Sequence, residues 1–190
     1  MMPAIEALIE LPEMLDSGTA TSSRGRINRA HTKAVRQALF NAMVKHHKTR
    51  IPQHFNKYKQ VKYQYKRRNP VTIAKKVRRG RDPADLVKSK RTKQSMTRKM
   101  TIRMSGTAGS GKVTATGVMT WPPGFYFPDK GPINRAVMND EIASFTFQET
   151  MDVGDDFIKE YMRLITIDLR SRRVSRRMKA RVLSQLGIIL

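Results

Sequence analysis

Residues 96–119 have the sequence MTRKMTIRMSGTAGSGKVTATGVM, and this stretch decides the fold class of the chain. The segments 96–104 and 112–119 are rich in Thr, Ile and Val and alternate in part between polar and apolar residues, which is typical of strands. The residues between them, SGTAGSG at 105–111, have the composition of a hairpin loop. The sequence therefore predicts an antiparallel β-hairpin.

Upstream of the hairpin the sequence predicts two helices and one strand. Apolar residues recur at helical spacing over 26–47 and predict a helix that ends before Pro52. In residues 58–66, YKQVKYQYK, apolar or aromatic side chains alternate with polar ones from Val61 onward. This alternation indicates a half-buried strand. A short basic helix is expected over 70–79, because proline suits the first position of a helix and Gly80 suits its end.

Downstream of the hairpin a helix is expected over 146–165. Thr146 and Glu149 have the spacing of a capping box, and inward-facing apolar residues follow at helical spacing. Residues 121–132, WPPGFYFPDKGP, contain too many prolines for a central strand and are interpreted as an ordered loop. Together these elements predict an α+β fold: a small antiparallel sheet with a prominent β-hairpin, packed by an N-terminal and a C-terminal helix, with extended terminal arms.

The expected organisation is one domain with two arms. Residues 1–25 are predicted to form an acidic, flexible N-terminal arm whose partner lies outside the core of its own chain. Residues 26–165 form the α+β domain, and 166–190 form a basic amphipathic C-terminal tail. No basic residue precedes the first apolar residues, so a secretory signal is not expected. No stretch approaches the length of a membrane span.

Charge is segregated along the chain. Residues 17–81 contain nineteen Lys or Arg and no Asp or Glu, whereas nine acidic residues lie in 129–168. The formal net charge of +23 calls for compensation by phosphate, by an acidic partner or by acidic segments of neighbouring subunits. The chain has no cysteine, which excludes a disulfide framework, a thiolate metal site and a cysteine nucleophile. Composition therefore favours a component of a larger assembly over a free-standing enzyme.

One segment is similar to a phosphate-binding loop. Residues 106–112 match the pattern GxxxxGK, but Val113 stands where a Ser or Thr hydroxyl ligates magnesium. Such a loop also leads into a helix, whereas the residues that follow Lys112 predict a strand. We therefore expect no nucleotide site, no cofactor and no enzymatic activity.

Two further clusters of residues are interpreted without a metal-binding or catalytic role. The four histidines lie in a region without the acidic residues that would complete a metal site, so they are interpreted as surface residues: His31, His46, His47 and His54. Four carboxylates of the last helix could act as a general acid and base, but they lie near its N-terminus, where acids favour the helix dipole. They are interpreted as a subunit interface: Asp152, Asp155, Asp156 and Glu160.

Basic clusters beside Tyr63 and Tyr65 and in the C-terminal tail are candidates for contact with nucleic acid or a partner. Lys and Arg bind phosphate, and aromatic rings stack on bases. No signature of a known nucleic-acid-binding module accompanies them, so phosphate contact and protein contact both stay open. The residues are Arg67, Arg68, Lys75, Lys76, Arg78, Arg79, Arg81, Arg172, Arg173, Arg176 and Arg177.

The order of these elements resembles that of the neck and tail-completion proteins of long-tailed bacteriophages, which join the head connector to the tail. The resemblance is carried by YQYKRR at 63–68 followed by Lys75 and Lys76, by DLVKS at 85–89 and by NDEIASFTFQE at 139–149. Lys90 stands where relatives often have a glycine. The resemblance covers residues 27–165.

The resemblance implies an α+β subunit of a ring around the DNA passage, with six copies favoured and no catalytic residues. Its partners would be further copies of itself, connector or adaptor proteins and tail proteins, with DNA in the lumen. Such a neck, tail-completion or tail-terminator protein is assembled in the bacterial cytoplasm and resides in the virion. Two other classes stay open: a ribosomal or other RNA-binding structural protein, and an enzyme that uses the 106–112 loop.

Overall fold

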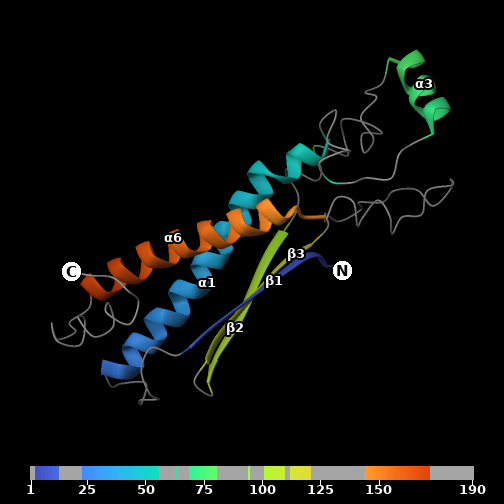
Figure 1. The fold of residues 1–190 in the computed structure, drawn as a ribbon. Coiled ribbons are helices and arrows are strands. Elements are labelled where there is room, and N and C mark those ends of the chain that lie inside the picture. Colours follow the sequence, from blue (N-terminus) through green and yellow to red (C-terminus); the bar gives the residue numbers. More distant parts are fainter. Residues whose placement is uncertain are drawn as a thin grey trace. The chain divides into compact units, whose positions relative to one another are not determined.

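A computed structural model describes residues 3–12, 23–55, 63, 69–80, 94, 101–109, 112–120 and 144–171. These residues form the elements drawn in Figure 1. The chain falls into two compact units. Unit 1 contains residues 1–6, 43–103 and 118–154, and unit 2 contains residues 7–42, 104–117 and 155–190.

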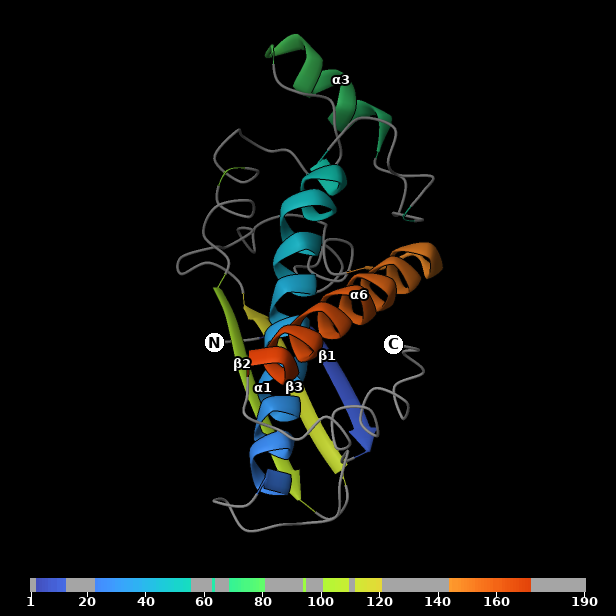
Figure 2. The same cartoon turned by 90° about the vertical axis from the view of Figure 1, so that its left-hand side faces the viewer.

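Three strands form one antiparallel sheet in the order β1-β3-β2, as Figure 2 shows. Strand β1 comprises Pro3–Pro12, β2 comprises Thr101–Gly109 and β3 comprises Lys112–Thr120. The pairing of β2 with β3 confirms the predicted hairpin, but the predicted loop at 105–111 is wrong for residues 105–109, which continue strand β2. At its open end the hydroxyl oxygens of Thr101 and Thr120 lie 2.5 Å apart, which links the two strands through their side chains.

The central strand β3 buries every second side chain. Val113, Ala115 and Met119 are buried, whereas Thr114 and Thr116 are only half-buried. This alternation follows from the two-residue period of a strand and indicates that one face of the sheet is covered more completely than the other.

The prediction of a flexible arm over 1–25 is wrong for residues 3–12, which form the edge strand β1 beside β3. Ile5 and Ile9 are half-buried, while the intervening Glu6 is exposed. Acidic residues in an apolar run suggested an arm. Glu6 and Glu10 are four residues apart and therefore lie on the same, exposed side of the strand, as a strand with one covered face requires.

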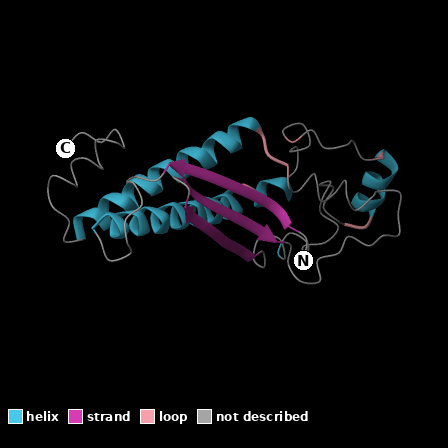
Figure 3. Cartoon of the chain, turned by 90° about the horizontal axis from the view of Figure 1, so that it is seen from below, coloured by secondary structure: helices cyan, strands magenta, loops and turns pink. Residues whose placement is uncertain are grey.

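Two long helices confirm the predicted N-terminal and C-terminal helices. Helix α1 spans Ser23–Thr49 and α6 spans Phe147–Ser171. Within unit 2 both lie along the same face of the sheet (Figure 3), and their buried residues recur at helical spacing. The apolar ones are Ile27, Ala30, Ala34, Val35, Ala38, Leu39 and Ala42 in α1, and Phe157, Tyr161 and Ile165 in α6.

The end of α6 differs from the prediction. The helix continues to Ser171, so the first residues of the predicted tail, 166–171, are helical. The boundaries of the predicted 26–165 domain stay a prediction, and the rest of the tail lies outside the described residues.

Among the described residues, unit 1 contains two short helices besides parts of α1 and α6. The 3-10 helix η1, Ile51–Phe55, buries Ile51, His54 and Phe55. Helix α3, Pro70–Arg78, confirms the predicted short basic helix. The predicted strand at 58–66, apart from Tyr63 in a turn, and the predicted loop at 121–132 lie outside the described residues.

The predicted capping box at the start of α6 is confirmed. The backbone N–H of Glu149 donates to Thr146 Oγ1 at 3.2 Å, and the N–H of Thr146 donates to Glu149 Oε2 at 3.2 Å. The other carboxylate oxygen of Glu149 accepts a hydrogen bond from the Tyr63 hydroxyl at 2.6 Å. One glutamate therefore both begins the helix and holds a distant residue of unit 1 against it.

Candidate partner and nucleic-acid interface

Helix α3 carries three of the predicted contact residues, with a fourth, Arg79, at its C-cap, and is capped at both ends. Asn69 Oδ1 accepts a hydrogen bond from the N–H of Val71 at 2.9 Å, and Pro70 occupies the first turn. Gly80 has a φ of +60°, the left-handed conformation that commonly follows a helix, and its N–H donates to the Val77 carbonyl at 2.9 Å. These caps define the helix although none of its residues is buried.

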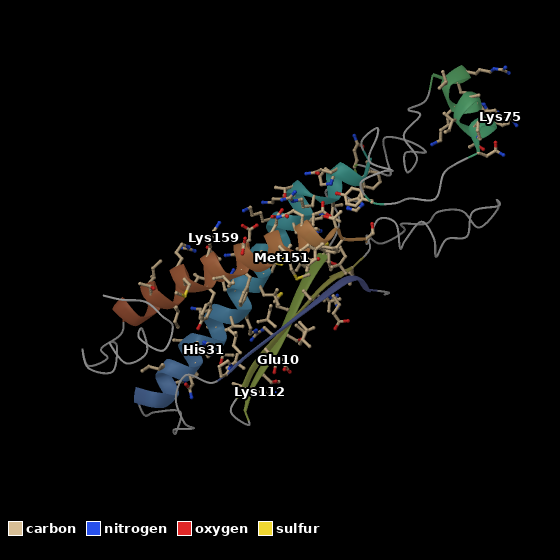
Figure 4. The ribbon with its side chains drawn as sticks, in the orientation of Figure 1. Glu10, His31, Lys75, Lys112, Met151 and Lys159 are labelled. Atoms are coloured by element: carbon tan, nitrogen blue, oxygen red, sulfur yellow. The ribbon has the colours of Figure 1, made fainter. Side chains whose placement is uncertain are left out.

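The side chains of α3 combine positive charge with exposed apolar surface. Lys75, labelled in Figure 4, is exposed together with Arg78 and Arg79, and Lys76 is half-buried. Val71 and Val77 are each 57 % exposed. A basic helix that also exposes two valines has the character of a docking element. The other predicted contact residues lie outside the described part of the chain: Arg67, Arg68, Arg81, Arg172, Arg173, Arg176 and Arg177.

The four carboxylates predicted for a subunit interface differ in accessibility. Asp152 forms an ion pair with Arg50 in unit 1. Glu160 is half-buried, and its carboxylate accepts hydrogen bonds from residues of unit 2. Asp156 is half-buried, whereas Asp155 is exposed. Asp155 is therefore the member of the set most open to a partner.

Glu160 accepts three hydrogen bonds within unit 2. Arg163 donates from Nη2 at 2.6 Å and from Nε at 2.9 Å, and Asn41 donates from Nδ2 at 2.6 Å. These hydrogen bonds stabilise the charged form of the Glu160 carboxyl and so lower its pKa. The hydrogen bond from Arg163 has the largest effect. Glu160 thus joins α6 to α1 within one chain.

A basic groove, not predicted from the sequence, lies in unit 2 between α1 and β2. It has a volume of about 610 Å³ and is lined by Arg29, Thr32, Lys33, Arg36, Gln37, Phe40, Met104 and Ala108. The three cations are exposed and span roughly 10 Å of α1, from the 1.5 Å rise per residue. None of the lining residues is acidic. The sequence signal was the recurrence of Arg29, Lys33 and Arg36 at helical spacing.

Gly106 of β2 allows α1 to approach the strand closely at this groove. A Cβ atom at Gly106 would lie 2.7 Å from the carbonyl oxygen of Thr114 and 3.1 Å from Arg36 Cδ. The first distance is too short for any side chain, so β2 and β3 would have to separate. The glycine that begins the GxxxxGK pattern therefore has a packing role.

Lys112, the last residue of that pattern, is the first residue of β3. Its Nζ lies 3.8 Å from Glu10 Oε2 of β1, as Figure 4 illustrates. The strand geometry agrees with the predicted hairpin and differs from the loop-to-helix arrangement that a phosphate-binding loop requires.

The interpretation of the four histidines as surface residues is wrong. His31, His46, His47 and His54 are 2 %, 4 %, 8 % and 2 % exposed, respectively. Two of them continue the apolar stripe of α1, since His31 lies four residues after Ile27 and His46 lies three residues after Met43. That spacing was the available signal for burial.

In unit 1, His46 and His54 belong to a buried polar cluster. The His54 ring stacks on Tyr63 with a centroid distance of 3.8 Å, and the His46 ring stacks on Phe145 at 4.4 Å. Burial, followed by the hydrogen bond to Glu149, raises the pKa of Tyr63. Burial lowers the pKa of His46 to about 4. Neither ring nitrogen of His46 has a hydrogen-bond partner among the described residues.

In unit 2, His31 connects three elements. Its Nε2 donates to the carbonyl oxygen of Pro12 in β1 at 3.1 Å, and the Tyr161 hydroxyl of α6 donates to its Nδ1 at 2.9 Å. Both bonds fit the neutral tautomer that carries its hydrogen on Nε2. Burial lowers the pKa of His31. The residue is therefore a structural link.

Among the described residues, no three His, Asp or Glu side chains are grouped so that they could hold a metal ion. None of the described helices combines the length and apolar character needed to cross a membrane. No family model matches the chain, and no curated protein or solved structure matches it either. The charge and exposure of α3, α6 and the basic groove are therefore the features that bear on function.

Proposed function

We propose that this chain is a structural virion protein that forms a ring at the head–tail junction of a long-tailed bacteriophage. As a neck, tail-completion or tail-terminator subunit, it would join the connector to the tail around the DNA passage. The observation that carries the proposal is that one chain exposes a basic helix, α3, and an acidic residue, Asp155, on a different helix. The resemblance of 27–165 to that family supports the same assignment.

Opposite charges on two different surfaces favour head-to-tail assembly. Contacts between unlike surfaces of successive copies produce a ring when the rotation between copies closes. Subunits with a formal charge of +23 repel one another unless acids of a neighbour or DNA phosphates compensate. A ring of six copies, with DNA in its lumen and connector and tail proteins on its two sides, supplies both kinds of compensation.

The purified protein is expected to form closed rings, measured as a discrete oligomer by mass photometry and as rings by electron microscopy. Asp155→Lys with Asp156→Lys should raise the concentration needed for assembly by about tenfold or more. Because Asp155 is exposed and Asp156 is half-buried, the free energy of unfolding should fall by no more than about 1 kcal/mol.

Glu6→Lys with Glu10→Lys is the matched control, since it makes the same charge change at exposed positions of β1. This control should still assemble. A protein that stays monomeric at high concentration and with its connector partner, or virion necks that lack the protein, would refute the proposal.

The basic groove favours a second candidate, an RNA-binding structural protein such as a ribosomal protein. Three exposed cations on one face of α1, with no acid in the lining, suit contact with phosphate. In the ring proposal the same groove would contact DNA in the lumen. Co-purification of the protein with ribosomal RNA through high-salt washing would favour the second candidate.

Replacement of Arg29, Lys33 and Arg36 by alanine is expected to weaken sequence-independent binding to duplex DNA. Each phosphate contact adds about 0.9 to the magnitude of the slope of log K against log salt. If the wild-type protein neutralises about six phosphates, its slope is near −5, and the triple variant should be less steep by roughly 2.7. Fluorescence anisotropy over a range of salt concentrations measures both slopes.

Alanine at Lys48, Arg103 and Lys159 removes the same charge from exposed positions that do not line the groove. This control should change the slope by less than the groove variant does. Equal changes in the two variants would contradict a binding role for the groove, and a salt-insensitive wild-type interaction would contradict phosphate contact altogether.

A further inference from the structure

Helix α3 is too short to be stable unaided. It has nine residues, none of them buried, and isolated helices shorter than about 12–15 residues are marginal in water. Helices of this length normally depend on the packing of an apolar face. Within the described part of the chain, only Ile73 and Lys76 of α3 are even half-buried, so the helix presents a face that is open to a partner.

The face of α3 that needs covering has an apolar centre and a basic edge. Pro70, Ala74 and Val77 share one face because they are spaced four and three residues apart, and all three are exposed. Lys75 and Arg78 flank this face and are also exposed. We call these five residues the basic ridge.

The first turns of α6 have the complementary character. Phe147 is 81 % exposed and Met151 is 49 % exposed, and their spacing of four places them side by side. A Cβ atom at Gly154 would meet nothing within 4 Å, so the surface stays open there. Asp155, four residues after Met151, is exposed at the edge of the same face. We call these four residues the acidic ridge.

We propose that the basic ridge of one copy docks on the acidic ridge of the next copy. The valine and alanine of α3 would cover the exposed phenylalanine and methionine of α6, and Lys75 and Arg78 would pair with Asp155. A second copy is the partner that charge complementarity favours, because the two ridges have opposite charge and each chain carries one of each. This inference rests on the proposed ring function and names the contact that closes the ring.

Two charge-reversed proteins test the contact. One carries Lys75→Glu and Arg78→Glu, and the other carries Asp155→Lys. Each alone should need at least about tenfold more protein to assemble. An equimolar mixture should recover the oligomer mass, because alternating copies bring reversed ridges together and wild-type ridges together. Lys48→Glu with Arg103→Glu, at exposed positions that belong to neither ridge, is the matched control and should assemble normally.

The outcomes separate this contact from the ring itself. If the wild-type protein forms no ring, the proposed function fails. If the wild-type protein forms rings and the reversed proteins assemble equally well, the contact is refuted while the ring function stands. Reversed proteins that fail to assemble both alone and in the mixture also refute the contact, because the two ridges then do not meet each other.

The absence of cysteine from the chain permits a second test. A protein with Val77→Cys mixed with a protein with Met151→Cys should be crosslinked by a short bismaleimide severalfold more than either protein alone. Leu8→Cys, at a position of β1 that is 60 % exposed, replaces Met151→Cys in the control mixture. Equal yields in the two mixtures would overturn the proposed contact.

Discussion

Removal of residues 1–12 is expected to unfold most of the chain at physiological temperature, because these residues include the edge strand β1. The truncation leaves one edge of β3 unpaired. It removes the three large half-buried apolar side chains of β1, those of Ile5, Ile9 and Leu11, which contribute roughly 1 kcal/mol each. It also removes the Pro12 carbonyl that accepts a hydrogen bond from His31. A buried donor left unsatisfied costs about 1–3 kcal/mol. The combined loss is comparable with the whole stability of many domains, about 5–15 kcal/mol.

Circular dichroism during thermal unfolding measures this effect, and two point variants refine it. Ile9→Ser, at a half-buried position, should lower the free energy of unfolding by about 1–2 kcal/mol, whereas Leu8→Ser, at a 60 % exposed position, should stay within about 0.5 kcal/mol. If the truncated protein melts cooperatively at the wild-type temperature, β1 contributes nothing to the folded sheet.

The elements that the sequence predicted correctly depend on residues close together in the chain. The hairpin follows from two segments rich in Thr, Ile and Val joined by small residues, although the turn itself is shorter than the predicted loop at 105–111 because β2 continues to Gly109. The start of α6 follows from the reciprocal hydrogen bonds of Thr146 and Glu149. Helix α3 follows from Pro70 at its first position and from Gly80 at its end, where the structure has a positive φ. Turn and capping chemistry acts over a few residues, so a single sequence is sufficient to recognise it.

The predictions that failed depend on contacts between distant residues. His31 is bonded to Pro12, nineteen residues away, and to Tyr161, 130 residues away. Whether a histidine is buried is decided by such partners, and its residue type gives little indication. Strand β1 is likewise defined by its pairing with β3.

In the candidate interface, too, features set by neighbouring residues were predicted and a feature set by distant residues was not. The cations of α3 and the accessible Asp155 were predicted, because charge and helical spacing are visible in one segment. The basic groove was not predicted, because Met104 and Ala108 of β2 form its second wall. The three cations of α1 became a groove only through the packing of α1 against β2 in unit 2.

His46 should make the folded protein less stable as the pH falls from 6.5 toward 4. The side chain is buried, and burial lowers its pKa from 6.5 to about 4. Below pH 6.5 the unfolded chain binds a proton that the folded chain does not, so stability is complete above pH 6.5, falls with the pH and levels off near pH 4. At 1.36 kcal/mol per pKa unit the loss approaches about 3 kcal/mol, with about 2 kcal/mol reached by pH 5. Attraction to Glu149 opposes the effect of burial, and repulsion from His54, Arg50 and His47 reinforces it.

Replacement of His46 by leucine should remove most of this pH dependence. The ring nitrogens of His46 have no partner among the described residues, and exchanging an unpartnered buried polar group for an apolar one is nearly neutral or stabilising. His46→Leu should therefore stay within about 1 kcal/mol of the wild type at pH 7 or exceed it. Chemical denaturation at pH 7, 6 and 5 measures the difference above the range in which most carboxylates titrate, near pH 4. A small residual slope is expected because burial also lowers the pKa of His31. A variant with the full wild-type slope would show that the folded protein accommodates a charged His46, and the acid sensitivity would then have to originate in another group.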